Sequence, residues 1–115
     1  MIEKMIRMGL LYDSYGSLLT ERQCKCIEMH YLQDLSLGEI ASELGVSRQA
    51  VNDILKRTEE AMLQYENCLQ LVHREQEQKE RMQQVHELIM EAMAKEHPAN
   101  EILQQALAVI NRIHK

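Results

Sequence analysis

The sequence predicts an all-α protein, in which a small helix-turn-helix bundle is followed by a long helical C-terminal extension. Three observations support this fold class. Residue types that favour helices, chiefly Leu, Met, Glu, Gln, Lys and Ala, dominate the composition. Aromatic residues make up only 3% of the chain, and strand-forming residues are few. Apolar residues also recur at three- and four-residue spacing along most of the chain, as they do on one face of a helix.

Two helices are predicted before the turn motif. In the first, apolar residues follow helical spacing at Met1, Met5, Met8 and Tyr12. Gly16, in the segment DSYGS, favours a turn that ends this helix. Thr20 is the predicted N-cap of the second helix. The predicted apolar face of the second helix consists of Cys24, Ile27 and Tyr31.

The segment LSLGEIASELGVSRQAVNDILKR has the features of a helix-turn-helix. Ser36 and Glu39 form a predicted capping box at the start of a helix over residues 37–44. Gly45 ends that helix, because glycine readily adopts the left-handed conformation of a tight turn. Ser47 is the predicted N-cap of the next helix. The apolar residues predicted to fill the space between the two helices are Ile40, Leu44, Val46, Val51 and Ile54.

The second helix of this motif is the predicted DNA-reading helix, because a recognition helix presents its outer face to base edges in the major groove. Arginine pairs well with guanine, whereas asparagine and glutamine pair well with adenine. Basic side chains on the same helix can contact phosphates. The predicted DNA-binding residues are Ser47, Arg48, Gln49, Asn52, Lys56 and Arg57.

The overall charge of the chain predicts that any binding to DNA is weak. Lys and Arg number 13 against 18 Asp and Glu, so the formal net charge is −5. Residues 47–57, however, have a local excess of positive charge. They contain three basic residues, Arg48, Lys56 and Arg57, and one acidic residue, Asp53. Charges more than about 8 Å away are largely screened at physiological salt, so a local patch can still bind phosphate. We therefore expect weak, salt-sensitive binding to double-stranded DNA.

The stretch LLTERQCKCIEMHYLQDLSLGEIASELGVSRQAVNDILKRTEEAM resembles region 4 of bacterial sigma factors. The elements that match are LTERQ, the position of Tyr31, LSLGEIASELGVSR and KR. The whole chain is still more similar to the YlxM-like family of small bacterial proteins, which carry this module and a helical extension without the core sigma regions. The resemblance implies a sigma region 4-like helix-turn-helix in a DNA-binding regulatory protein. It also implies a link to the signal recognition particle pathway of protein targeting, which is inferred in that family from gene neighbourhood.

Three residues of the predicted reading helix depart from the sigma pattern. Ala50 and Leu55 are apolar at positions where sigma-type helices usually carry basic or polar residues, and Asp53 would face DNA as an anion. These departures argue against strong, promoter-like binding. An alternative hypothesis is that the chain does not bind DNA and instead docks onto a protein or ribonucleoprotein partner through the same fold.

The helical pattern continues to the C-terminus, so we expect residues 1–60 to form the helix-turn-helix domain and residues 61–115 a helical extension. The polar segment HREQEQKER is either a solvated helix or a hinge, and Pro98 precedes a predicted last helix. An isolated helix buries too little apolar surface to be stable, so the apolar stripe of the extension either folds back on the domain or pairs with a second copy. We favour a homodimer. The stripe consists of Met62, Tyr65, Leu69, Val72, Met82, Val85, Ile89, Ala92 and Met93.

No catalytic, metal or cofactor site is predicted. Cys26 and His30 are four residues apart on a predicted helix, but no second pair has the spacing of zinc ligands. The sequence has no glycine-rich phosphate loop and no nucleophile–base signature, so we do not expect an enzyme. The three cysteines form no disulfide-like framework, which is typical of a reducing compartment. Since neither a signal peptide nor an apolar run of about 20 residues is evident, we expect a cytoplasmic protein with no membrane span.

Overall fold

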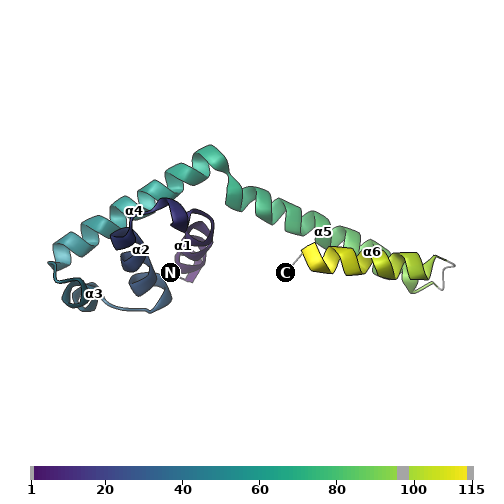
Figure 1. The fold of residues 1–115 in the computed structure, drawn as a ribbon, viewed down its shortest axis with the longest axis horizontal. Helices are drawn as coiled ribbons and strands as arrows, with labels where there is room; N and C mark the ends of the chain where they lie inside the picture. Colours follow the sequence, from purple (N-terminus) through teal and green to yellow (C-terminus); the bar gives the residue numbers. More distant parts are fainter. Residues whose placement is uncertain (1, 96–98, 114–115) are drawn as a thin grey trace. The chain divides into compact units, whose positions relative to one another are not determined.

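The computed structural model describes residues 2–95 and 99–113, and it confirms the all-α prediction: these residues form helices joined by short turns, with no strand among them (Figure 1). The chain divides into two compact units, Met1–Val72 and His73–Lys115. The helices of the first unit are α1 (Ile2–Tyr15), α2 (Glu21–Ile27), α3 (Leu37–Leu44) and α4 (Arg48–Leu69). A 3-10 turn over Gly16–Leu18 follows α1, and a π-helical turn over Glu28–Leu32 follows α2. The remaining helices are α5 (Leu71–Met93) and α6 (Asn100–Ile113).

The central helix of the first unit is α4, which packs against α1, α2 and α3. Apolar side chains from all four helices meet in one core, and their burial is the main favourable contribution to folding of the unit. On α2 the predicted face is partly wrong, because Cys26 is buried whereas Cys24 is only partly buried. The core consists of Met8, Leu11, Tyr15, Cys26, Ile27, Tyr31, Ile40, Ala41, Val51, Leu55, Met62 and Val72.

The first helix ends at Tyr15, directly before Gly16, as the glycine predicts. Its buried face differs from the predicted one. Leu11 and Tyr15 are fully buried together with Met8, whereas Met5 is exposed. Leu11 and Tyr15 lie three and seven residues after Met8, so all three side chains lie on the same side of the helix. The predicted contribution of Met1 falls outside the described residues.

The first unit extends beyond residue 60, where the sequence predicted its boundary. Residue 60 lies inside α4, and Met62 and Val72 are buried in the core of the unit. Tyr65 packs against the same core. Three residues that were predicted to form an apolar stripe in the extension therefore complete the helix-turn-helix unit instead, and the stripe left for other contacts is shorter.

A turn at Gln70 separates α4 from α5. Gln70 has φ 54° and ψ 35°, a left-handed conformation that is uncommon for any residue other than glycine. Beside the turn, the Tyr15 hydroxyl donates to Glu66 Oε1 at 2.5 Å and accepts from the Leu71 N–H at 3.0 Å. Glu66 Oε1 also accepts from the Val72 N–H at 3.1 Å. Two buried side chains thus bind N–H groups in the first turn of α5, where a helix offers no partner of its own.

Two further tyrosine hydroxyls donate to glutamates of the first unit. Tyr12 on α1 donates to Glu28, and Tyr31 in the π-helical turn donates to Glu59 on α4. The hydrogen bond to Glu28 is the main cause that raises the pKa of Tyr12, whereas burial is the main cause that raises the pKa of Tyr31. Lys4 Nζ lies 3.6 Å from Glu59 Oε1. Part of the acidic charge of the chain therefore binds the helices of this unit together.

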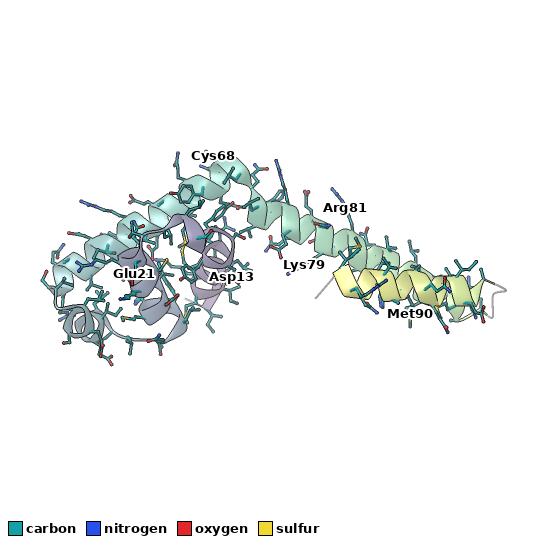
Figure 2. The ribbon with its side chains drawn as sticks, in the orientation of Figure 1. Asp13, Glu21, Cys68, Lys79, Arg81 and Met90 are labelled. Carbon is teal, nitrogen blue, oxygen red and sulfur yellow. The ribbon has the colours of Figure 1, made fainter. Side chains whose placement is uncertain are left out.

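The second unit consists of α5 from His73 onward and α6. The segment HREQEQKER is helical and mostly exposed, so of the two alternatives the solvated helix is the correct one. Ion pairs between Glu75 and Lys79 (3.8 Å) and between Glu77 and Arg81 (3.6 Å) lie along it at four-residue spacing, and Lys79 and Arg81 are labelled in Figure 2. Pro98, which was predicted to open the last helix, lies outside the described residues.

Candidate nucleic-acid interface

The hydrogen bonds that the sequence predicts around the turn are present. Ser36 Oγ accepts from the Glu39 N–H at 3.1 Å, and Glu39 Oε1 accepts from the Ser36 N–H at 3.1 Å. Gly45 has φ 67°, and its N–H donates to the carbonyl of Ala41. Ser47 Oγ accepts a backbone N–H of the first turn of α4 at 3.0 Å. The end of α3 and the start of α4 are therefore set by local hydrogen bonds, and the Ser47 hydroxyl is engaged in one of them.

A small apolar core holds α3 and α4 together. Ile40 and Val51 are fully buried, and the other three residues predicted to fill this space pack against the core. Those three partly buried residues are Leu44, Val46 and Ile54. The prediction of the contact between the two helices is therefore confirmed, and the contact determines which side of α4 faces outward.

Leu55 belongs to this core and not to the outer face of α4. It is 5% exposed and follows Val51 by four residues, which places both on one side of the helix. Ala50 is half-buried. The expectation that Leu55 replaces a polar residue on the outer face is therefore wrong. Of the departures from the sigma pattern, Asp53 is the one that lies exposed beside the predicted site.

The outer face of α4 carries the predicted DNA-binding side chains. Gln49, Asn52 and Lys56 follow three- and four-residue spacing, which places them on one side of the helix. Arg48 and Arg57 flank this side. All of these side chains are exposed except Asn52, which is half-buried. The helix therefore presents amides near its N-terminus and cations around them.

The cations of this face are not neutralised by a neighbouring carboxylate. Within the described residues, no salt bridge involves Arg48, Lys56 or Arg57. Asp53 is the one carboxylate in the segment 47–57, and its Oδ1 accepts a hydrogen bond from Gln49 Nε2 at 3.3 Å. The face thus offers three positive charges to phosphates. The amide of Gln49, in contrast, already makes a weak, exposed hydrogen bond to Asp53.

Next to the start of α4 lies a shallow depression lined by Leu37, Arg48, Gln49 and Asn52. A Cβ placed on Gly38 would lie 3.9 Å from Cδ of Arg48, so the stem of this arginine runs close to α3. The sequence pattern did not identify Leu37 and Gly38 as neighbours of the site. Their proximity depends on how α3 and α4 cross. Residue spacing within one helix contains no information about that crossing.

A second depression lies between α2 and α3 and contains charges of both signs. It is lined by Glu21, Arg22, Lys25, Glu43 and Leu44. Lys25 Nζ lies 3.5 Å from Glu21 Oε1, and Glu21 is labelled in Figure 2. Because acidic and basic side chains alternate here, this surface adds little net positive charge to that of α4.

The described residues offer no metal-binding cluster of His, Cys, Asp and Glu side chains. Cys26 is buried, and burial raises the pKa of its thiol, which makes it a poor ligand or nucleophile. None of the described helices is both long enough and apolar enough to cross a membrane.

Comparison with known proteins identifies the family. The family model described as "Putative helix-turn-helix protein, YlxM / p13 like" matches residues 2–105. The chain belongs to this YlxM/p13-like family. Among the relatives of this YlxM/p13-like chain are UPF0122 proteins of Bacillus thuringiensis (strain Al Hakam) and Bacillus cereus (strain 03BB102), each 44% identical over 113 residues. Each alignment covers 98% of this chain and 99% of the relative.

The family match agrees with the geometry. In this YlxM/p13-like chain the helix-turn-helix consists of α3, the turn at Gly45, and α4. The match continues through α5 and ends inside α6, so most of the second unit lies within the segment that the family model matches. Membership of a helix-turn-helix family suggests a regulator that binds nucleic acid.

Proposed function

We propose that this chain is a non-enzymatic regulatory protein that binds double-stranded DNA by placing the first turns of α4 in the major groove. The observation that carries the proposal is the exposed outer face of α4, whose three cations have no carboxylate partner within the described residues. The caps at Ser36 and Ser47 and the turn at Gly45 hold this helix in a fixed relation to α3. Such a fixed crossing is what allows a recognition helix to enter a groove in one orientation.

Each residue of the face has a proposed role. Arg48, Gln49 and Asn52 lie in the first turns of α4, where recognition helices contact base edges, and we assign base contacts to them. Lys56 and Arg57 lie further along the helix, and we assign phosphate contacts to these two. Ser47 acts as the N-cap and leaves neighbouring backbone N–H groups at the helix N-terminus available to a phosphate.

Binding should be weak and moderately dependent on salt. With at most three cations on phosphates, the slope of log affinity against log salt concentration should be about −3 or shallower. The net charge of −5 and the carboxylate of Asp53 both oppose approach to a polyanion. We expect it to act by occupying DNA, since the YlxM-like family carries this module without the core regions with which sigma factors open promoters.

We further propose that this regulation serves protein targeting by the signal recognition particle in the cytoplasm. This part of the proposal rests on the resemblance to the YlxM-like family and on no residue of the chain. A second candidate function is docking onto a protein or ribonucleoprotein through the same face. The hydrogen bond between Gln49 and Asp53 favours this second function. An amide that already binds a neighbouring carboxylate is less able to form hydrogen bonds with DNA bases.

Fluorescence anisotropy with labelled duplex DNA at low salt tests the DNA-binding proposal. Arg48→Ala should lower affinity by roughly tenfold or more and should reduce discrimination between sequences. Lys56→Ala should weaken binding to all sequences about equally and make the salt slope shallower by about 1. Lys79→Ala, which removes an exposed cation from α5, is the matched control and should have little effect. Absence of binding by the wild-type chain at low salt would exclude the proposal.

Affinity purification of the tagged protein from its own cells separates the two candidate functions. Enrichment of one DNA locus supports the regulator. Enrichment of the protein or RNA of the targeting particle, together with failure to bind duplex DNA, supports docking. If neither is enriched and deletion changes neither expression of targeting genes nor insertion of membrane proteins, the link to targeting is wrong.

A further inference from the structure

The second unit has no fully buried side chain among its described residues, 73–95 and 99–113. Met82 and Ile89 on α5 and Leu103 and Ile110 on α6 are half-buried, each pair separated by seven residues. Among the described residues only these two helices form the unit, so the other helix is the neighbour against which each half-buried stripe can pack. Units of roughly 40 residues usually need a disulfide, a metal or oligomerisation to be stable. The hairpin alone therefore lacks an adequate core.

A second apolar stripe runs along each helix of the hairpin and is not covered within the unit. The exposed fraction is 65% for Leu88 and 67% for Ile102, which is high for side chains of this kind. On α5 the stripe consists of Val85 and Leu88, and the half-buried Ala92 lies on the same side of the helix. On α6 it consists of Ile102, Val109 and Ile113.

The two exposed stripes lie on the same side of the hairpin. Successive residues turn by about 100° around a helix axis, so Leu88 lies about 100° before Ile89, and Ile102 lies about 100° before Leu103. In both helices the exposed stripe is therefore offset from the covered stripe in the same rotational sense. Because α6 returns along α5 in the opposite direction (Figure 1), equal offsets bring both stripes to one surface. We call this surface the hairpin face.

We propose that the hairpin face is a homodimer interface, in which the hairpins of two chains pack face to face as a four-helix bundle. A second copy presents a face of the same length and the same apolar character, and twofold symmetry pairs the face with itself. The four helices would then enclose the core that one hairpin lacks. Charge does not oppose this pairing strongly, because residues 73–113 carry five Lys and Arg against seven Asp and Glu.

The dimer does not depend on the proposed binding to DNA. It would nevertheless present two copies of α4 to one duplex, which is how many helix-turn-helix proteins compensate for a weak single contact. The assignment also corrects the earlier expectation about which residues take part. Met62, Tyr65 and Val72 belong to the core of the first unit, so the interface is confined to α5 and α6.

Light scattering coupled to size exclusion, with the full chain at micromolar concentration, tests the proposal. The wild-type chain should have twice the mass of one chain. Leu88→Glu and Ile102→Glu place charges in the hairpin face and should give a monomer. Met90→Glu is the matched control: Met90 is 50% exposed on α5 and labelled in Figure 2, but it lies on the side of α5 away from Leu88. The control should remain dimeric.

Milder variants distinguish loss of the dimer interface from loss of folding. Leu88→Ala favours helix and removes most of the apolar contact, so the dissociation constant of the dimer should rise about tenfold or more. Met90→Ala should change it less than about twofold, and circular dichroism should show equal helix content in both. A monomeric wild-type chain would overturn the proposal and indicate that the face packs within one chain. A dimer that persists in Leu88→Glu and Ile102→Glu would show that another surface forms it.

Discussion

The hydroxyl of Tyr15 and the carboxylate of Glu66 form a buried hydrogen bond of 2.5 Å, although the two residues are 51 positions apart in the sequence. The bond joins the end of α1 to the last turns of α4. The same two side chains also accept the backbone N–H groups of Leu71 and Val72. One polar pair therefore connects three helices at the end of the first unit.

Removal of either partner should destabilise the protein. Tyr15→Phe and Glu66→Ala should each lower the free energy of unfolding by about 1–3 kcal/mol, because buried polar groups lose their hydrogen-bond partners. Chemical denaturation followed by circular dichroism measures both. Gln64→Ala, at an exposed position of α4, is the control and should change stability by less than about 0.5 kcal/mol. Strictly additive losses in the double variant would contradict the direct interaction.

Gly45 and Gln70, which both adopt the left-handed conformation at the end of an α-helix, should respond to substitution with opposite signs. Gly45→Ala should destabilise the protein by about 1–2 kcal/mol, although no other atom lies within 4 Å of the added Cβ, because the cost arises from the backbone conformation. Gln70→Gly should stabilise it by about 0.5 kcal/mol. Glycine relieves the strain of the left-handed backbone, but it also loses more conformational entropy on folding, which offsets part of the gain. Thermal unfolding compares them. Destabilisation by Gln70→Gly would mean that contacts of the glutamine side chain outweigh its backbone strain.

Stability should fall at alkaline pH because the pKa values of Tyr12 and Tyr31 are raised in the folded chain. Below the ordinary tyrosine value of 10.0, both residues are neutral whether the chain is folded or unfolded, so they add no pH dependence. Above it, the unfolded chain releases these protons while the folded chain retains them, and unfolding becomes more favourable as pH rises. Denaturant midpoints measured across this range should drop. The double variant Tyr12→Phe, Tyr31→Phe should show a smaller drop, and an equal drop would refute the assignment.

Asp53 should limit the affinity of the outer face of α4 for DNA. Asp53→Asn removes the one carboxylate of the segment 47–57 and should raise the affinity for duplex DNA severalfold at low salt. The gain should shrink as salt is added, because screening weakens the repulsion that the substitution removes. Glu91→Gln makes the same change of charge at an exposed position on α5 and is the control for anisotropy titrations. Equal gains in both variants would mean that only the total charge of the chain matters.

The parts of the fold that the sequence predicts well are those that depend on neighbouring residues. Thr20, Ser36 and Ser47 each accept a backbone N–H three residues further along, as predicted, and Gly45 adopts the left-handed turn. A cap of this kind involves a few consecutive residues, so its signature is present in the sequence itself. The same holds for the exposure of Arg48, which follows from helical spacing relative to buried residues.

Polar contacts between helices were not predictable in the same way. Hydrogen bonds join Tyr12 to Glu28 and Tyr31 to Glu59. Neither the residue types nor their spacing in the sequence indicates that these side chains are in contact. The end of α4 was missed because Gln70 takes a conformation that usually requires glycine, and no glycine marks the position. Leu55 was placed outward by comparison with sigma helices, although its spacing from Val51 already indicated burial.

At the candidate site, the sequence identified the exposed side chains of α4 but not their surroundings. The depression beside Arg48 includes Leu37 from α3, and the sequence contains no sign of the crossing that brings them together. The hydrogen bond from Gln49 to Asp53 spans four residues and could have been anticipated from helical spacing. Its presence matters because it occupies one of the amides assigned to base contacts.

The burial of Met62, Glu66 and Val72 determines where the protein can be divided for experiments on the isolated helix-turn-helix unit. A fragment that stops at residue 60 would keep the whole recognition motif but would lack two core side chains and the carboxylate that binds the Tyr15 hydroxyl. Such a fragment should unfold readily, and a negative DNA-binding result obtained with it would be uninformative. A fragment that retains Val72 includes every residue of the core and is the shortest one suited to crystallisation with a duplex.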